Sequence, residues 1–214
     1  MYTPGHFAVT RIEILRELMR RHPLATLVTL SSVGLTANHI PLEYDAEPGP
    51  YGTLRGHVAR GNPLWRDYNA DTDALAVFQG ADSYVTPGWY PTKQQSGKVV
   101  PTWNYAVVHA SGPLRVIEDR EWLRALVTRL TNQHEAAQSN PWKVTDAPAD
   151  FIDGLLGAII GIEIPIRNIT GKWKVSQNRN EADRAGVIDG LRAAGTADAR
   201  DMAGLVEDVP GDQR

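Results

Sequence analysis

The sequence contains no cysteine among its 214 residues. This absence excludes disulfide bonds, thiolate zinc sites, thiolate-held iron–sulfur clusters and cysteine nucleophiles. Long apolar runs are absent too, because the longest spans residues 155–162 and a membrane helix needs about 20 residues. No basic region followed by an apolar run opens the chain, so we expect no secretory signal, no membrane partner and a cytoplasmic location.

The common catalytic and nucleotide-binding motifs are also missing. The sequence has no G-x-S-x-G, no G-x-G-x-x-G and no G-x-x-x-x-G-K-[ST]. Its 6 histidines show no H-E-x-x-H spacing, so no metal site is predicted. The sequence therefore identifies no catalytic residue and leaves the question of an enzyme open.

An excess of positive charge is lacking as well. The chain has 22 basic and 25 acidic residues, for a net charge of −3. The acidic surplus lies in the last 20 residues, which leaves the body of the chain balanced. A dedicated nucleic-acid-binding protein usually carries a basic excess or stripe. DNA therefore stays open as a partner that the charge does not support.

What is present predicts an α+β fold. Alternating and branched residues predict strands over 24–30, 35–44, 51–58, 74–78, 82–86, 158–165 and 169–176. Residues 102–117 are expected to form one long strand or a bent pair of strands around Gly112. Apolar residues at helical spacing predict helices over 10–22, 118–138, 150–156 and 182–194. Short strands with little helix between them favour an antiparallel barrel with helices outside it. We expect a single domain over residues 1–194, a loop over 87–98 and a disordered tail over 195–214.

The segment from Gly56 to Trp65 is the first candidate for binding. A strand ends there, a turn follows, and Asn62-Pro63 begins a short helix. Free N–H groups at a helix start favour an anion, and Arg60 can direct its guanidinium at two phosphate oxygens. His57 lies just before the turn. Taken alone, however, this pattern fits a capped surface helix with a solvated arginine better.

The segment from Val100 to Ala110 is the second candidate. On a strand, Thr102 and Asn104 share one face, while Trp103 and Tyr105 share the other. Small polar groups beside aromatic area suit the edge of a planar heterocycle. The alternative is a half-buried strand with aromatic core residues. Asparagine is disfavoured within strands, so the presence of Asn104 favours a ligand-binding role for this segment.

Two further segments carry aromatic and basic side chains. The turn at Pro87 displays Trp89 and Tyr90, which would form a stacking lid, plug the barrel end or lie at a subunit interface. Near the C-terminus, Lys172 and Lys174 alternate with apolar residues before a capped helix, which suits a phosphate or an anionic ring. The alternative is a solvated edge strand, which we favour for Lys174.

Five segments in this order together resemble PaiB-like proteins, which are FMN-binding proteins regarded as negative transcriptional regulators. The segments are Met1–Phe7, Gly56–Pro63, Tyr84–Tyr90, Val100–Tyr105 with Val108-His109, and Lys174–Arg179. The resemblance covers residues 1–194. It implies a split antiparallel β-barrel like that of pyridoxamine-phosphate oxidases, and a homodimer with FMN in a groove at the subunit interface.

The resemblance also implies roles for nine residues. Arg60 and the turn to Asn62 would hold the FMN phosphate, with His57 nearby. Three would line the isoalloxazine ring or the ribityl chain: Thr102, Trp103 and Asn104. Three would approach from the C-terminal segment of the same or the partner subunit: Lys172, Gln177 and Asn178.

Three functions follow from these observations. The first is an FMN-binding transcriptional regulator, although no helix-turn-helix is recognisable. The second is a flavin-dependent oxidoreductase or flavin reductase using NAD(P)H, in which the flavin would supply the chemistry. The third is haem binding on the same barrel through His39, His57 or His109, and it ranks below the other two.

Overall fold

The structure is a computed structural model that describes residues 1–208. The chain divides into two compact units that are made of interleaved segments. Unit 1 contains residues 1–18, 79–109 and 170 onward, and unit 2 contains residues 19–78 and 110–169. Within the described residues, no helix is both long and apolar enough to cross a membrane. The expectation of a single domain over residues 1–194 stays a prediction.

The strands form two sheets whose pairings are antiparallel. One sheet has the order β1-β10-β7-β6-β2-β3 and the other has the order β4-β5-β9-β8. The strands are β1 Ala8–Val9, β2 Leu24–Ser31, β3 Gly34–Pro41, β4 Glu43–Asp45, β5 Thr53–Ala59, β6 Ala74–Val85, β7 Thr102–Gly112, β8 Arg115–Ile117, β9 Ile159–Pro165 and β10 Asn168–Lys174. Antiparallel sheets flanked by helices confirm the predicted α+β class.

Six α-helices and four 3-10 turns connect and flank these strands within residues 1–208. The α-helices are α1 Ile12–Arg21, α2 Thr92–Ser96, α3 Arg120–Glu135, α4 Ala149–Gly157, α5 Glu181–Ala194 and α6 Ala197–Glu207. The 3-10 turns are η1 Gly5–Phe7, η2 Pro63–Trp65, η3 Pro87–Trp89 and η4 Val144–Asp146. Side-chain caps begin several of them: Asp119 caps α3 and Asn180 caps α5.

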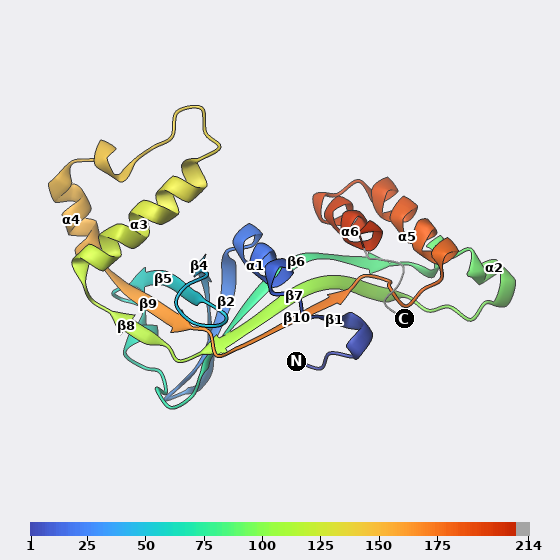
Figure 1. Ribbon diagram of the computed structural model, residues 1–214, viewed down its shortest axis with the longest axis horizontal. Coiled ribbons are helices and arrows are strands. Elements are labelled where there is room, and N and C mark those ends of the chain that lie inside the picture. The colour runs from blue at the N-terminus through green and yellow to red at the C-terminus, as the bar shows by residue number, and fades with distance from the viewer. Residues whose placement is uncertain (209–214) are drawn as a thin grey trace. The chain divides into compact units, whose positions relative to one another are not determined.

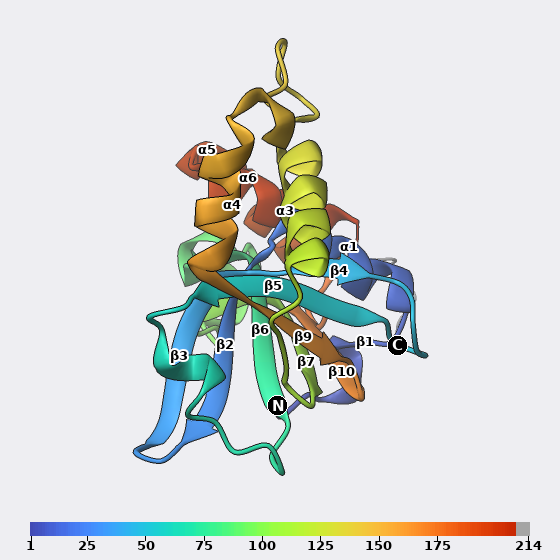
Figure 2. The ribbon, with the colours of Figure 1, turned by 90° about the vertical axis from the view of Figure 1, so that its left-hand side faces the viewer.

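In unit 2, α3 and α4 lie side by side against β5 and β9 (Figure 2). Their contact forms a small core of Leu123, Ile152 and Leu156. Gly161 on β9 allows this packing, because a Cβ there would lie 2.4 Å from the Trp122 ring. The absence of one side chain on the strand thus allows the helix to approach closely.

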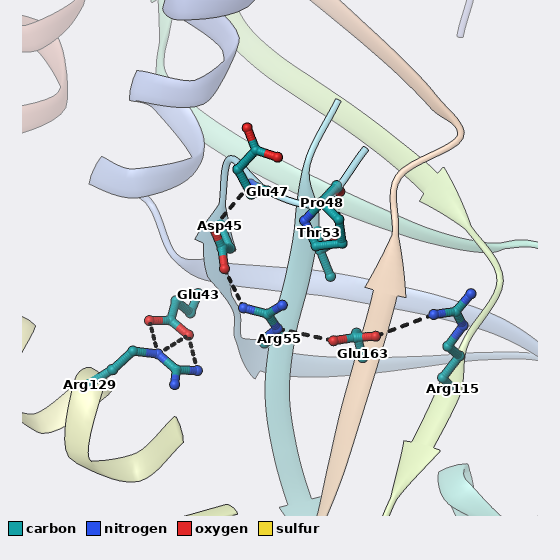
Figure 3. Close-up of polar contacts among 9 residues, drawn as sticks. All are labelled: Glu43, Asp45, Glu47, Pro48, Thr53, Arg55, Arg115, Arg129 and Glu163. Carbon is teal, nitrogen blue, oxygen red and sulfur yellow. Dashed lines mark hydrogen bonds and ion pairs between the residues drawn. The ribbon is translucent and has the colours of Figure 1, made fainter. Parts of the chain in front are cut away.

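A network of ion pairs crosses the four-stranded sheet of unit 2 (Figure 3). Arg55 on β5 lies between Asp45 and Glu163, with Nε 3.0 Å from the Glu163 carboxylate. Arg129 on α3 donates from Nε and Nη2 to Glu43 on β4 at 2.9 Å. The first group joins neighbouring strands, and the second joins the helix to the sheet edge.

In unit 1, α5 and α6 form a helical hairpin (Figure 1). The η3 turn rests in a groove on α5 that two glycines leave open. A Cβ on Gly186 would lie 2.0 Å from the Trp89 carbonyl oxygen, and a Cβ on Gly190 would lie 2.2 Å from the Trp89 ring. Tyr90 is buried beside it. Trp89 therefore packs within the chain against α5, a contact that none of the three interpretations of these aromatics described.

The structure differs from the predicted elements along β6 and at the loop that follows it. Residues 74–85 form one strand where two were expected, because Gly80 continues the strand. A Cβ on Gly80 would lie 3.0 Å from the Leu18 side chain, so this glycine serves packing and does not make a turn. The expected loop 87–98 contains η3 and α2. The expected strand 35–44 is divided between β3 and β4.

A second difference concerns the tail that we expected to be disordered from residue 195. Residues 197–207 form α6, whose start is capped by Thr196. Its Met202, Ala203 and Val206 are buried at helical spacing, so tertiary packing adds to the helix propensity of its alanines. Residues 209–214 of the predicted tail lie outside the described residues.

Candidate functional site

The turn after β5 is built as the sequence predicts. The Asn62 side chain accepts a hydrogen bond from the Leu64 N–H at 2.9 Å and so caps η2. Its own amide donates to Asn38 Oδ1 at 2.9 Å. Asn62 therefore has a defined orientation, set by its cap and by the neighbouring strand β3.

Arg60 in the same turn is already engaged by the protein. Its Nε donates to the Gly157 carbonyl at 2.9 Å, and Nη1 donates to Glu118 at 3.1 Å. Its guanidinium also lies 5.7 Å from the centroid of the Trp65 ring. The side chain is 39% exposed, so solvent still reaches it. A phosphate bound here would compete with the Glu118 carboxylate.

His57 lies on β5 and faces a different hollow from Asn62. Its hollow of about 340 Å³ is also lined by Leu130, His134 and Trp142, whereas Asn62 lines a hollow of about 500 Å³ beside β3. His57 Nδ1 is buried without a hydrogen-bond partner among residues 1–208. Burial lowers the pKa of His57, so its imidazole is neutral near pH 7.

In unit 1, β7 has the two faces that its sequence predicts. Trp103 is 51% exposed, whereas Asn104 is 1% exposed. Asn104 Nδ2 donates to Ser176 Oγ at 2.9 Å, and its Oδ1 is buried with no hydrogen-bond partner in the described chain. Beside it, the Lys174 ammonium donates to Thr102 Oγ1 and, at 2.9 Å, to the Trp103 carbonyl. The polar face is thus an internal network.

The opposite face of β7 is aromatic and partly open. It lines a hollow of about 370 Å³ together with residues of β6 and the N-terminus: Met1, Gln79, Asp82, Trp103, Tyr105, Val107 and His109. The Trp103 Nε1–H donates to Asp82 Oδ1 at 2.8 Å. The Tyr84 ring meets Trp103 edge-on, with centroids 6.0 Å apart. Trp103 is therefore held in place although half of it is exposed.

Lys172 on β10 brings a positive charge to this aromatic group. Its Nζ lies 5.3 Å from the Tyr105 ring centroid and 5.9 Å from that of Tyr2, and it donates to the Tyr2 carbonyl at 3.1 Å. The other two C-terminal candidates lie differently. The Gln177 side chain bonds to backbone groups of its own turn, and Asn178 is exposed.

The structure adds three residues that sequence reasoning missed: Gln79, Asp82 and Tyr84 on β6. Asp82 and Tyr84 are two residues apart, so their alternation was a usable signal. It was overlooked because two separate strands, over 74–78 and 82–86, were expected in place of β6. No group of three or more His, Cys, Asp or Glu side chains that could hold a metal ion occurs in residues 1–208.

Comparison with known sequences gives a consistent match. Residues 1–168 match the protein family described as "Putative FMN-binding domain". The "Protease synthase and sporulation protein PAI 2" of Bacillus subtilis is 34% identical over 208 residues, which cover 97% of each chain. An uncharacterized protein of Emericella nidulans, AN0679, is 35% identical over 243 residues, again with 97% of each chain covered.

Solved structures show the same fold at low sequence identity. The flavocytochrome Anf3 from Azotobacter vinelandii superposes with a TM-score of 0.59 at 12% identity, covering 84% of this chain and 75% of that chain. The FAD and heme binding protein from Mycobacterium smegmatis gives 0.53 at 18% identity, covering 78% and 72%. The fold is the split β-barrel that the resemblance implied.

Proposed function

The chain belongs to this family of FMN-binding split-barrel proteins, and on that premise we propose that it is a homodimeric, FMN-binding negative regulator of transcription. The observation that carries the proposal is the 34% identity with PAI 2 over 97% of both chains. The exposed aromatic face of β7, with Lys172 beside it, supports the flavin part of the proposal.

The residues of this face suit the chemistry of FMN. The cofactor has a planar aromatic ring and a phosphate, so it calls for aromatic area and positive charge. Trp103 and Tyr105 offer the first, and Lys172 offers the second. When bound, FMN supplies the redox chemistry of its ring. The residues of this chain would bind and orient it.

The nine residues expected from the resemblance remain the proposed binding set. They are His57, Arg60, Asn62, Thr102, Trp103, Asn104, Lys172, Gln177 and Asn178. The unpartnered Nδ1 of His57 supports the choice of that residue, because buried polar atoms normally have partners. A ligand with N–H and O–H groups would satisfy such atoms.

A second copy of the chain is the proposed partner of an apolar sheet face in unit 2. Residues that alternate along β2, β3 and β6 leave this face open: Thr26, Val28, Leu30, Leu35, Ala37, His39, Leu75 and Val77. Leu35 is 77% exposed on it. Contiguous apolar surface of this kind is typical of subunit interfaces.

The test is an FMN titration followed by flavin fluorescence and absorbance. The wild type should bind FMN with micromolar affinity, and Trp103→Ala should weaken binding about tenfold because the stacking surface is lost. Phe151→Ala, which removes an exposed aromatic ring from α4, is the matched control and should bind like the wild type. If the wild type does not bind FMN, the proposal is wrong.

The same samples separate the regulator from a flavin reductase. A regulator should oxidise added NAD(P)H no faster than free FMN does under the same conditions. Rapid turnover by the wild type that is lost in Trp103→Ala would instead favour the oxidoreductase.

A further inference from the structure

The connection between β6 and β7 in unit 1 carries unbalanced positive charge. Residues 83–109 contain no aspartate or glutamate. Lys93 and Lys98 both lie in this stretch and are exposed. The exposed side chains of Gln94 and Gln95 lie between them. Figure 1 shows α2 at the far end of the ribbon that β6 and β7 form within this unit.

Two cations from the C-terminal segment join this connection. Lys174 donates to the Trp103 carbonyl at 2.9 Å, and the Arg179 guanidinium lies 4.6 Å from the Tyr90 ring centroid. We call Lys93, Lys98, Lys174 and Arg179 the basic arm. None of the four forms an ion pair with a carboxylate of residues 1–208.

The cations of the basic arm also influence one another. Burial lowers the pKa of Lys174, Tyr105 raises it in part, and the positive charges of Lys172 beside the arm and of Arg179 within it lower it further. An anion close to this group would relieve the repulsion between these charges. The arm is therefore electrostatically suited to a ligand with several negative charges.

The segment that carries Lys93 and Lys98 is fixed by packing and hydrogen bonds to α5. The buried carboxylate of Asp183 on α5 accepts hydrogen bonds from the Thr92 N–H at 3.2 Å and from Thr92 Oγ1 at 2.8 Å. Trp89 fits against Gly190 of the same helix. At the other end of α2, Gly97 stops the helix with a positive φ of 65°. The lysines are thus presented from a fixed base.

We propose that the basic arm binds the phosphate backbone of duplex DNA. Regularly spaced phosphates match several cations that have no carboxylate partner, and neutralisation of the phosphates releases counterions from the duplex. The short helix α2, which lies in the connection between β6 and β7, can enter a major groove about 12 Å wide. Glutamine amides at the end of the ribbon can hydrogen-bond to phosphates and base edges. The proposal rests on the regulatory function proposed above and locates its contact surface.

The proposal explains how a chain of net charge −3 can bind a polyanion. The acidic surplus lies in residues 195–214, and α6 within it packs on α5 of the same unit, whereas Lys93 and Lys98 lie on the exposed connection between β6 and β7. Phosphate contacts act within a Debye length of about 10 Å, so local charge decides binding at moderate salt. Net charge alone therefore underestimates this surface.

The experiment measures fluorescence anisotropy of a labelled, mixed-sequence DNA duplex of about 30 base pairs, with the full chain and FMN at several salt concentrations. The wild type should bind with a linear dependence of log affinity on log salt. Lys93→Ala/Lys98→Ala should weaken binding and reduce that slope by about 2 per protomer. Lys143→Ala, which removes an exposed lysine in unit 2, is the control and should match the wild type.

An FMN titration of the wild type, Lys93→Ala/Lys98→Ala and Lys143→Ala distinguishes failure of the DNA proposal from failure of the flavin proposal. Normal FMN binding by Lys93→Ala/Lys98→Ala shows that the variant is folded. If this variant keeps the salt slope of the wild type, or if the wild type binds FMN but not the duplex, the proposal that the basic arm binds DNA is wrong. Either result would leave the flavin proposal unaffected. Tighter binding of a single-stranded oligonucleotide or of duplex RNA would overturn the assignment to duplex DNA. Absence of FMN binding in the wild type would count against the proposed function alone.

Discussion

Arg60 shows how a candidate ligand is held by the protein's own groups. Its donors contact Glu118 and the Gly157 carbonyl. If Arg60 binds the FMN phosphate, Glu118→Gln should tighten FMN binding a few-fold by removing a competing charge, and Arg60→Ala should weaken it about tenfold. The measurement is an FMN titration, with Arg167→Ala as the control for an exposed arginine ion pair. Unchanged affinity in Arg60→Ala would remove this residue from the site.

His57 gives the stability of the protein a pH dependence. Its pKa is lowered by burial from 6.5, so the unfolded chain binds more protons than the folded chain just below that pH. The contribution of His57 to the free energy of unfolding should therefore be fully present above about pH 6.5. It should be lost as the pH falls towards the lowered pKa of His57 in the folded state. In urea unfolding, His57→Asn should show a smaller fall between about pH 7.5 and about pH 5.5.

The control for this measurement is His134→Asn, which changes an exposed histidine near the same hollow. Burial also lowers the pKa of His109, so the His57 variant should reduce the fall and not abolish it. An equal fall in His57→Asn and the wild type would show that burial of this imidazole does not shape the stability.

At the scale of elements, the glycines of helices have opposite roles. A Cβ on Gly190 of α5 would lie 2.2 Å from the Trp89 ring, whereas a Cβ on Gly154 of α4 meets nothing within 4 Å. Gly190→Ala should lower the free energy of unfolding by about 1–3 kcal/mol through overpacking. Gly154→Ala should raise it by about 0.5–1 kcal/mol through helix propensity. Urea unfolding measures the free energy of unfolding of both variants. If the two substitutions change it equally, Gly190 does not make room for Trp89 as the structure indicates.

Local signals predicted the elements well where the deciding residues are neighbours in sequence. The Asn62 cap and the alternation of Trp103 and Asn104 on β7 are confirmed. The helix α6 was missed because its Gly- and Asp-containing composition was interpreted as disorder, although Thr196 caps the helix, its alanines favour helix and Met202 is buried.

The site was harder to predict for a related reason. The pairing of Arg60 with Glu118 joins residues 58 positions apart and depends on where α3 docks. No local pattern reports such a contact. The contribution of Asp82 to the Trp103 face likewise depends on which strands are neighbours in the sheet.

At the scale of the whole molecule, the main prediction concerns assembly. Leu35→Glu places a charge on the apolar face of β2, β3 and β6 and should convert a dimer into a monomer in sedimentation equilibrium, because an unpaired charge cannot be buried cheaply. Leu155→Glu, at an exposed position on α4, is the control and should leave the dimer intact. A wild type that sediments as a monomer would contradict the proposed assembly.

The interleaving of the two compact units limits how gene fusion and truncation can separate them during evolution. Unit 1 uses three separate stretches of the chain, and unit 2 uses two. No single cut in the gene therefore releases either unit, and no single joining event can attach one of them to another protein. Unlike proteins whose domains follow one another along the chain, this one is expected to pass through evolution as an indivisible whole, with new segments added at its ends or in its loops.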